Sequence, residues 1–364
     1  MSVLLLALAA GMTGCAGDDT PVTSAIEATR FTWRELPPLP RAIAGQMAGN
    51  SHGALLVAGG TDFPAPPTEG GAKVWYDTVH VLEPGASSWT STTPLPHPLA
   101  YAAAATTADR VVLAGGSDAT QHYADVRSLE WADGSLISTD LPAMPEPLAM
   151  AGAAILDGVF YVVGGQGAPD SVTASAAVFA LDLGAPESGW YQLPLLPGQG
   201  RVLPVVVAQA GRLIVASGAA LSRDADGRSI REYLTDAWVW TPDARSETAA
   251  ARRGVWQRIE DVPRPVVAAP SAPLGDSGIV VFGGDDGELA AQAAQLADGH
   301  PGFSRDILAY DTTTGTWMSL GTMPHGLVTT MAVPMDAAIA IIGGEDRPGH
   351  RSATVLLGQP GGED

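Results

Sequence analysis

The feature that most constrains this sequence is an apolar strand ending in two small residues, which recurs six times along the chain. Successive pairs are separated by 49 to 66 residues, a period typical of proteins in which each repeat is one supersecondary unit. The chain therefore has to fold as six similar units that bury their apolar faces against one another. The pairs are Gly59-Gly60, Gly115-Gly116, Gly164-Gly165, Ser217-Gly218, Gly283-Gly284 and Gly343-Gly344.

A tryptophan marks the same place in five of the six repeats, 26 or 27 residues before the next small-residue pair. The repeat without a tryptophan has Ser138 near this place. A Pro-rich corner follows every one of these sites, and a further strand lies between each pair and the next tryptophan. Each repeat therefore contains material for four strands. The tryptophans are Trp33, Trp89, Trp190, Trp256 and Trp317.

This arrangement resembles that of Kelch β-propellers over residues 30–360. The resemblance implies an all-β fold, a six-bladed Kelch β-propeller in which each repeat supplies one four-stranded blade, with residues 361–364 as a tail. The last repeat ends after its third strand, whereas the chain begins with an unpaired fourth strand that carries Trp33. We therefore expect residues 31–36 to pair with residues 353–357 and to close the last blade, which leaves the ring without a free sheet edge.

The amino-terminal residues have the features of an export signal. Residues 3–12 form an apolar run that is too short to cross a membrane as a helix. The run ends in MTGC, which is similar to a bacterial lipobox, and Cys15 is the only cysteine. We expect residues 1–14 to be a lipoprotein-type signal peptide, Cys15 to carry the lipid, and residues 15–29 to be a flexible tether. An ordinary secretory signal is the alternative, and both place the protein in the periplasm or cell envelope.

Charge narrows the range of partners. The chain has 39 acidic and 19 basic side chains, and a net charge of −20 repels nucleic acid and anionic lipid alike. We therefore expect no nucleic-acid partner, contact with a membrane only through the lipid, and a monomer. Lys73 is the only lysine, so positive charge is otherwise carried by arginine, which suits the recognition of carboxylates. The seven histidines lack metal-ligand spacing, and we expect neither a metal nor a cofactor.

A functional site is expected on the propeller face where the loop after each second strand emerges. The two residues after the small-residue pairs include an acid in four of the six repeats, among them Asp285, Asp286 and Glu345. An aspartate in this place commonly caps its own turn, and this is the alternative for Asp62 and Asp118. Glu345 is the only glutamate at the position, and glutamate is a poor turn cap. It is therefore the leading candidate for chemistry.

The last repeat carries a closer resemblance. Its sequence IGGEDRPGHR, which ends at Arg351, is similar to the proposed catalytic segment of the bacterial N-acetylneuraminate epimerases, which are Kelch mutarotases of sialic acid. Its place in the last repeat resembles the cyclically permuted branch of that family. The resemblance implies that Glu345 is the acid and base, that Arg351 binds the substrate, and that the protein is an exported carbohydrate mutarotase acting on N-acetylneuraminate or a related sugar.

A site with one carboxyl group and one arginine is sufficient for the interconversion of sugar anomers. Interconverting two anomers requires a proton to leave the anomeric hydroxyl and a proton to reach the ring oxygen, and one carboxyl group can do both. A sugar acid also carries a carboxylate, which an arginine fork can hold. Further candidates for binding the substrate are Arg201, Arg305, Arg41, Asp285 and Asp286.

Structural roles compete with these assignments. Glu345 and Arg351 could form a salt bridge within their own loop, and the other arginines could link neighbouring blades. The competing function is a non-catalytic Kelch propeller that binds a glycan or an envelope protein.

Overall fold

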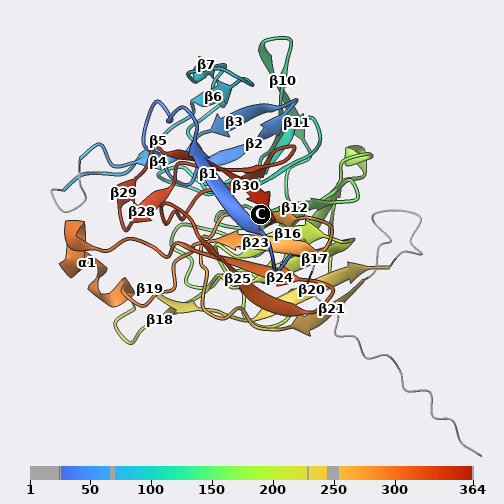
Figure 1. Ribbon diagram of the computed structural model, residues 1–364, viewed down its shortest axis with the longest axis vertical. Helices are drawn as coiled ribbons and strands as arrows, with labels where there is room; N and C mark the ends of the chain where they lie inside the picture. The colour runs from blue at the N-terminus through green and yellow to red at the C-terminus, as the bar shows by residue number, and fades with distance from the viewer. Residues whose placement is uncertain (1–23, 25, 66–69, 228, 244–253, 363–364) are drawn as a thin grey trace, which may run out of the picture.

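The computed structural model describes residue 24 and residues 26–65, 70–227, 229–243 and 254–362. Within these residues, the strands form six four-stranded antiparallel sheets, which are the blades of a β-propeller (Figure 1). The predicted all-β, six-bladed architecture is confirmed. The part of the chain that the structure describes also contains one short helix, α1 (Ala293–Leu296), and three short 3-10 helices, η2 (Pro186–Ser188), η4 (Ala290–Gln292) and η5 (Ala297–Gly299).

The first three blades follow one another along the chain. The strands of blade 1 are β2 (Met47–Ser51), β3 (Ala54–Ala58), β6 (Val79–Leu82) and β7 (Thr90–Thr92). Those of blade 2 are β8 (Ala103–Thr106), β9 (Val111–Ala114), β10 (Val126–Ala132) and β11 (Ser135–Leu141). Those of blade 3 are β12 (Gly152–Leu156), β13 (Val159–Val163), β14 (Val178–Asp182) and β15 (Trp190–Gln192).

The other three blades complete the ring. The strands of blade 4 are β16 (Val205–Gln209), β17 (Arg212–Ala216), β20 (Ala237–Pro242) and β21 (Gly254–Ile259). Those of blade 5 are β22 (Ser271–Leu274), β23 (Gly278–Phe282), β24 (Asp306–Asp311) and β25 (Thr316–Thr322). Those of blade 6 are β26 (Ala332–Pro334), β27 (Ile339–Ile342), β30 (Val355–Gly361) and β1 (Arg30–Glu35).

The second strand of each blade is the apolar run that precedes a small-residue pair. Strands β3, β13 and β23 are buried at all five positions, because neighbouring blades cover both faces of each sheet. This is why these strands are continuous apolar runs instead of alternating polar and apolar residues. At the end of β3, Gly59 has a φ of 65°, and an added Cβ would lie 2.0 Å from the carbonyl oxygen of Leu99. Only glycine allows the link to the next blade to pass so close.

The two ends of the chain close the ring as predicted. Strand β1 pairs with β30 in an antiparallel register that places Phe31 opposite Pro360 and Trp33 opposite Gly358. The ring of Trp33 packs against Phe282 of blade 5, with 5.8 Å between ring centroids. The residues of β30 that pair with β1 are Leu356 to Gly361, so the pairing lies closer to the C-terminus than the expected residues 353–357. Blade 6 is therefore assembled from both termini.

In four blades, a tryptophan at the outer strand forms a hydrogen bond with the segment that connects the preceding blade to its own; we call this segment the link that enters the blade. Each indole N–H donates a hydrogen bond to a backbone carbonyl of the preceding link. The bonds run from Trp89 to Pro37 (2.8 Å), Trp190 to Pro142 (2.7 Å), Trp256 to Pro194 (3.1 Å) and Trp317 to Glu260 (2.9 Å). The constant spacing between tryptophan and small-residue pair thus reflects one repeated contact between each blade and the link that enters it.

A ring of backbone hydrogen bonds surrounds the propeller axis. One residue at the start of each blade donates its N–H to the carbonyl of its counterpart in the preceding blade, and six such bonds of 2.7 to 3.1 Å close on themselves. All six residues have a positive φ, although only one of them is glycine. These residues, which we call the axial ring, are Gly45, Tyr101, Met150, Leu203, Ala268 and Thr329.

The amino-terminal boundary of the propeller differs from the prediction. Residues 1–23 and 25, which include the predicted signal peptide and Cys15, lie outside the described residues. The described part of the predicted tether is not free: Ile26 is 4% exposed in the core of blade 5, and the Ser24 hydroxyl donates a 2.6 Å hydrogen bond to Asp311. The apolar side chain of Ile26 explains this, because its burial is favourable. Among the described residues, no helix has the length and apolar character needed to cross a membrane.

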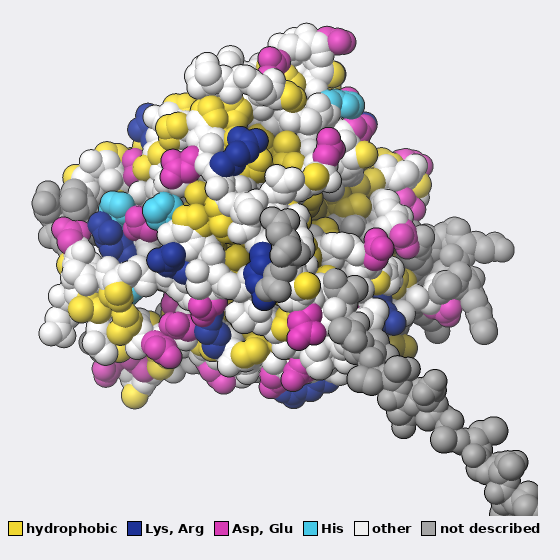
Figure 2. Space-filling view, viewed as in Figure 1, with side chains coloured by type: hydrophobic (Ala, Val, Ile, Leu, Met, Phe, Trp, Pro, Cys, Tyr) yellow, Lys and Arg dark blue, Asp and Glu magenta, His cyan; other side chains and the backbone are white. Residues whose placement is uncertain are grey.

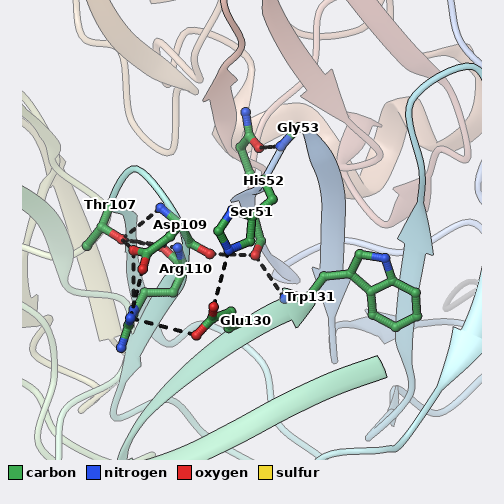
Figure 3. A network of polar contacts seen from close by, with 9 residues as sticks. Ser51, His52, Gly53, Thr107, Asp109, Arg110, Glu130 and Trp131 are labelled. Carbon is green, nitrogen blue, oxygen red and sulfur yellow. Dashed lines mark hydrogen bonds and ion pairs between the residues drawn. The ribbon is translucent and has the colours of Figure 1, made fainter. Parts of the chain in front are cut away.

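The face opposite the small-residue pairs carries a polar network between blades 1 and 2 (Figure 3). The Ser51 hydroxyl donates a hydrogen bond to the carbonyl of Asp109 and accepts one from the N–H of Trp131. Arg110 pairs with Asp109 at 2.7 Å, and its hydrogen bonds are the main cause that lowers the pKa of the Asp109 carboxyl to about 2. His52 contacts Glu130 at 3.2 Å. This network joins two hairpins and lies away from the candidate site.

Candidate functional site

The residue after each small-residue pair occupies an equivalent place in every blade. Each pairs through an isolated bridge with the link that begins its own blade, immediately before the axial ring. The bridges are Ala44 with Thr61, Ala100 with Ser117, Ala149 with Gln166, Val202 with Ala219, Val267 with Asp285 and Val328 with Glu345. Glu345 therefore lies beside the propeller axis, at the position predicted from the repeat pattern.

Three blades extend this face with small hairpins, and blade 5 extends it with the helical segments η4, α1 and η5. The hairpins are β4 (Thr61–Asp62) with β5 (Val74–Trp75), β18 (Ala219–Arg223) with β19 (Ser229–Tyr233), and β28 (Glu345–Arg347) with β29 (His350–Arg351). Figure 1 shows these hairpins and α1 gathered at one side of the molecule. Figure 2 shows basic and histidine side chains around the β28–β29 hairpin on this side. These segments follow the second strands of their blades, so they lie on the face where a site was expected.

The β28–β29 hairpin brings Glu345 and Arg351 together. The tight turn at Pro348 and Gly349 places the two residues directly opposite each other in the antiparallel register. The Arg351 guanidinium forms an ion pair with Oε1 of Glu345, and the Gly349 N–H lies 3.3 Å from Oε2. Both side chains are largely enclosed, with 15% of Glu345 and 3% of Arg351 exposed. The spacing of six residues in the sequence is therefore the spacing of a cross-strand pair.

Blade 1 supplies the other wall around this pair. The Arg351 guanidinium carbon lies 4.9 Å from the ring centroid of Phe63, and its Nη2 lies 3.5 Å from the hydroxyl of Thr61. The Lys73 ammonium lies within 5.7 Å of the same Phe63 ring and donates a 3.1 Å hydrogen bond to the hydroxyl of Tyr101. Two cations thus border the same aromatic ring, and one of them, Arg351, pairs with the Glu345 carboxylate.

Tyr101 connects this wall to the axis. It belongs to the axial ring, and its side chain packs over Gly45, where an added Cβ would lie 2.6 Å from the tyrosine ring. A cavity of about 140 Å³ adjoins Tyr101 and is lined by the innermost strands of all six blades, so it lies on the axis. Its lining is mostly small and apolar, with Gln46 and Thr330 among the polar side chains. Tyr101 is the residue that the cavity shares with the charged group, since it lines the cavity and accepts the hydrogen bond of Lys73.

Asp285 and Asp286 lie on the same face in blade 5. The Asp285 carboxylate accepts a 2.9 Å hydrogen bond from the hydroxyl of Tyr233, and it also accepts the N–H of Gly287. Burial, together with the Asp285 charge, raises the pKa of the Tyr233 hydroxyl to about 12. Asp286 accepts the N–H of Glu288 at 3.0 Å, as an aspartate that caps its own turn does. No direct contact joins these carboxylates to Glu345 in the described residues.

The structure does not bring Arg201 to this group. Its guanidinium is fully buried between blades 3 and 4, where it forms two hydrogen bonds of 2.8 and 2.9 Å with Asp236 and donates to the carbonyl of Ser217. Burial alone would raise the pKa of Asp236, but the bonds from Arg201 and Trp238 hold it below its ordinary value. These contacts are those of an inter-blade link, the role that competed with substrate binding.

The remaining arginine candidates have other partners. Arg305 donates from Nε to the carbonyl of Met323 at 2.8 Å, a contact within blade 5. Arg41 is exposed in the link that enters blade 1, where its guanidinium carbon lies 4.4 Å from the ring centroid of Tyr76 and Nη1 donates to the Tyr76 hydroxyl. Among the described residues, no three His, Cys, Asp or Glu side chains converge as ligands for a metal ion.

Lys73, Phe63 and Thr61 were not among the residues predicted for the site. The only available signal was that Lys73 is the single lysine of the chain. Its position next to Phe63 depends on how the hairpin of β4 and β5 folds back over the axis. Sequence spacing does not determine that fold.

Comparisons with known proteins agree with this picture. No protein family model matches the chain. The N-acetylneuraminate epimerase of Yersinia pestis (strain Pestoides F) is 27% identical over 200 residues, 51% of this chain and 50% of that protein. The protein of the same name from Salmonella enteritidis PT4 is 33% identical over 127 residues, 30% of this chain and 33% of its own. The chain thus spans half the length, or less, of these curated relatives.

A solved structure supports the fold. The structure of YjhT superposes with a TM-score of 0.64 at 16% sequence identity, and the match covers 88% of this chain and 96% of that one. The predicted resemblance to the N-acetylneuraminate epimerases is confirmed over about half of the chain. The chain is a six-bladed Kelch-type β-propeller whose sequence is related to the N-acetylneuraminate epimerases.

Proposed function

We propose that this protein is a carbohydrate mutarotase that interconverts the anomers of N-acetylneuraminate or a related sugar acid, with Glu345 as general acid and base. The observation that carries the proposal is the position of the Glu345 carboxylate, held by Arg351 beside the axis and next to an aromatic wall. The names of the relatives, which cover about half the chain, support the same substrate class.

The reaction is a pair of proton transfers. The Glu345 carboxylate takes the proton of the anomeric hydroxyl while the bond between the anomeric carbon and the ring oxygen breaks. The electron pair of that bond goes to the ring oxygen, which receives a proton from Glu345 or from a water molecule. The open-chain carbonyl then rotates so that its opposite face meets the hydroxyl that becomes the ring oxygen. The reverse proton transfers close the ring and give the other anomer. Acid and base catalysis of this kind contributes about 10²- to 10⁴-fold.

Arg351 positions the base. Its guanidinium is 97% enclosed and pairs with one oxygen of Glu345, while the Gly349 N–H approaches the other. These contacts fix the orientation of the carboxylate before substrate arrives, and pre-organised polar groups are what a proton-transfer site requires. With 15% of its side chain exposed, Glu345 remains accessible from the face of the propeller.

Export belongs to the same proposal. We propose that residues 1–14 direct the chain out of the cytoplasm and that lipidation of Cys15 anchors it at the cell envelope. The support is the apolar run at residues 3–12 that ends in MTGC. A sugar acid released outside the cytoplasm would then meet the enzyme there. Metabolic labelling with a fatty acid, compared between the wild-type protein and Cys15→Ser, tests this part: label on both proteins would refute lipidation at Cys15.

The catalytic proposal is tested by proton NMR. Freshly released α-N-acetylneuraminate relaxes to its anomeric equilibrium without help, and the wild-type protein should increase the relaxation rate in proportion to its concentration. Glu345→Gln should lower this acceleration by about 10²- to 10⁴-fold, because it removes the proton acceptor and keeps the side-chain size.

The matched control is Asp346→Asn. Asp346 is the next residue on the same hairpin, and its carboxylate contacts His350 at 2.7 Å instead of Arg351. This variant should keep the wild-type acceleration within about threefold. If the wild-type protein leaves the relaxation rate unchanged, or if Glu345→Gln and Asp346→Asn behave alike, the mutarotase proposal fails. Binding of the sugar without acceleration would then favour the competing function, a glycan-binding propeller.

A further inference from the structure

We propose that Lys73 is the group that anchors the negative charge of the substrate, so that the site selects sugar acids over neutral sugars. The inference rests on the proposed function and adds a specificity-determining residue to it. It assigns to the chain's only lysine a role that the segment resemblance had given to Arg351.

The surroundings of Arg351 argue against a direct role for it. Only 3% of its side chain is exposed, and the Glu345 carboxylate and the Phe63 ring enclose its guanidinium. Its Nε and Nη1 have no hydrogen-bond partner among the described residues, but both atoms are buried, so a carboxylate from solution reaches them only if the enclosing side chains, Glu345 among them, move away. Breaking an enclosed pair in this way is costly. Arg351 therefore positions Glu345, and another cation is needed to bind the carboxylate of the substrate.

Lys73 has the properties that this role requires. Its side chain is half-buried, and its ammonium lies 5.2, 5.4 and 5.7 Å from the ring centroids of Tyr101, Trp75 and Phe63. Aromatic faces at such distances stabilise a cation and restrict where it points. Within the residues that the structure describes, Lys73 has no ion pair, and its one hydrogen bond goes to the Tyr101 hydroxyl. An ammonium has three donors, so two remain for an incoming anion.

The geometry places this charge where a sugar acid would need it. Lys73 and Arg351 border the same Phe63 ring from 5.7 and 4.9 Å, so the ammonium and the Glu345 base belong to one site. In a sugar acid of the sialic acid type, the carboxylate is attached to the anomeric carbon itself. A cation that shares the Phe63 ring with Arg351, the partner of the base, can therefore hold the carboxylate while the base reaches the anomeric hydroxyl. A positive charge here also offsets the repulsion of an anion by a protein of net charge −20.

The test compares an acid with its neutral ester. Dissociation constants of N-acetylneuraminate and of its methyl ester are measured by titration calorimetry, and KM and kcat for the acid by the NMR relaxation assay. Lys73→Met keeps the length of the side chain and removes the charge. It should weaken binding of the acid by about 10- to 100-fold, the value of one charged hydrogen bond, and raise KM similarly, with little change in kcat and in binding of the ester.

The matched control removes a different positive charge from the same face. Arg347 lies on β28 near Asp346, at 3.8 Å, and no aromatic ring encloses it among the described residues. Arg347→Met should leave binding of the acid within about twofold of wild type. Lys73→Arg should recover part of the affinity that Lys73→Met loses, because a cation is restored. Melting temperatures of all variants establish that each is folded.

Three results would overturn the assignment. Equal weakening of acid and ester in Lys73→Met would mean that Lys73 only supports the aromatic wall. An unchanged affinity for the acid would exclude Lys73 as the anchor. If Arg347→Met lost as much affinity for the acid as Lys73→Met, the effect would come from the net charge of the protein and not from a specific contact. Failure of the proposed function is a separate outcome: binding of the acid would still depend on Lys73, but no protein would accelerate mutarotation.

Discussion

The buried pair of Arg201 and Asp236 offers a quantitative test of the difference between a structural and a substrate-binding arginine. Arg201 is fully enclosed, and Asp236 is 18% exposed, so water screens the pair weakly. Removing one partner of a buried pair leaves an uncompensated charge and costs about 3–5 kcal/mol. Because Asp236 retains some contact with water, we expect Arg201→Met to lower the free energy of unfolding by about 3 kcal/mol, the lower end of that range.

Urea unfolding at 25 °C, followed by the fluorescence of the tryptophans, measures this change. The double variant Arg201→Met with Asp236→Leu should recover part of the loss, because neither charge is then left alone in the wall between blades 3 and 4. Mutarotation by folded Arg201→Met should stay within about twofold of wild type. Unchanged stability together with lost activity would refute the reasoning and return Arg201 to the substrate site.

Three further predictions concern closure, titration and packing. Deleting residues 24–36 should abolish cooperative unfolding at the wild-type midpoint, since blade 6 loses β1; an unchanged melting curve would contradict closure. From pH 10 to 12 an unfolded chain loses the Tyr233 proton that the folded protein keeps, so stability falls as pH rises. Tyr233→Phe should reduce this fall in urea midpoints, and identical pH profiles would exclude the shift. Gly45→Ala should displace Tyr101 and weaken binding of the sugar acid at least several-fold by calorimetry, whereas unchanged affinity would show that the ring tolerates a Cβ there.

The large-scale fold could be predicted from the sequence because its determinants are local and repeated. Each small-residue pair marks a close backbone approach, as at Gly59, and four of the five tryptophans mark a hydrogen bond to the segment that enters their blade. Counting strands was sufficient to predict that the first strand completes the last blade. The limit of the tether was missed because a single apolar residue, Ile26, in a polar segment produces no periodic pattern.

The candidate site was predictable only in part. Glu345 and Arg351 lie on one short hairpin, so their pairing follows from spacing alone. Arg201 meets Asp236 across 35 positions of sequence, and only the packing of neighbouring blades decides between that partner and a substrate. Lys73 reaches the site because the hairpin of β4 and β5 folds toward the axis, a direction set by three aromatic neighbours that no repeat period describes.

The axial ring bears on how such a protein can change over evolution. Every blade contributes one backbone N–H and one backbone carbonyl to this ring. The side chains at the six positions vary, from glycine in one blade to methionine and tyrosine in others. A circle of identical backbone links has no beginning, so the gene could be opened at any other blade junction and rejoined at the present ends without disturbing the axis. Chains that begin at a different blade can therefore preserve the same centre, while the hairpins around the rim diverge to recognise new ligands.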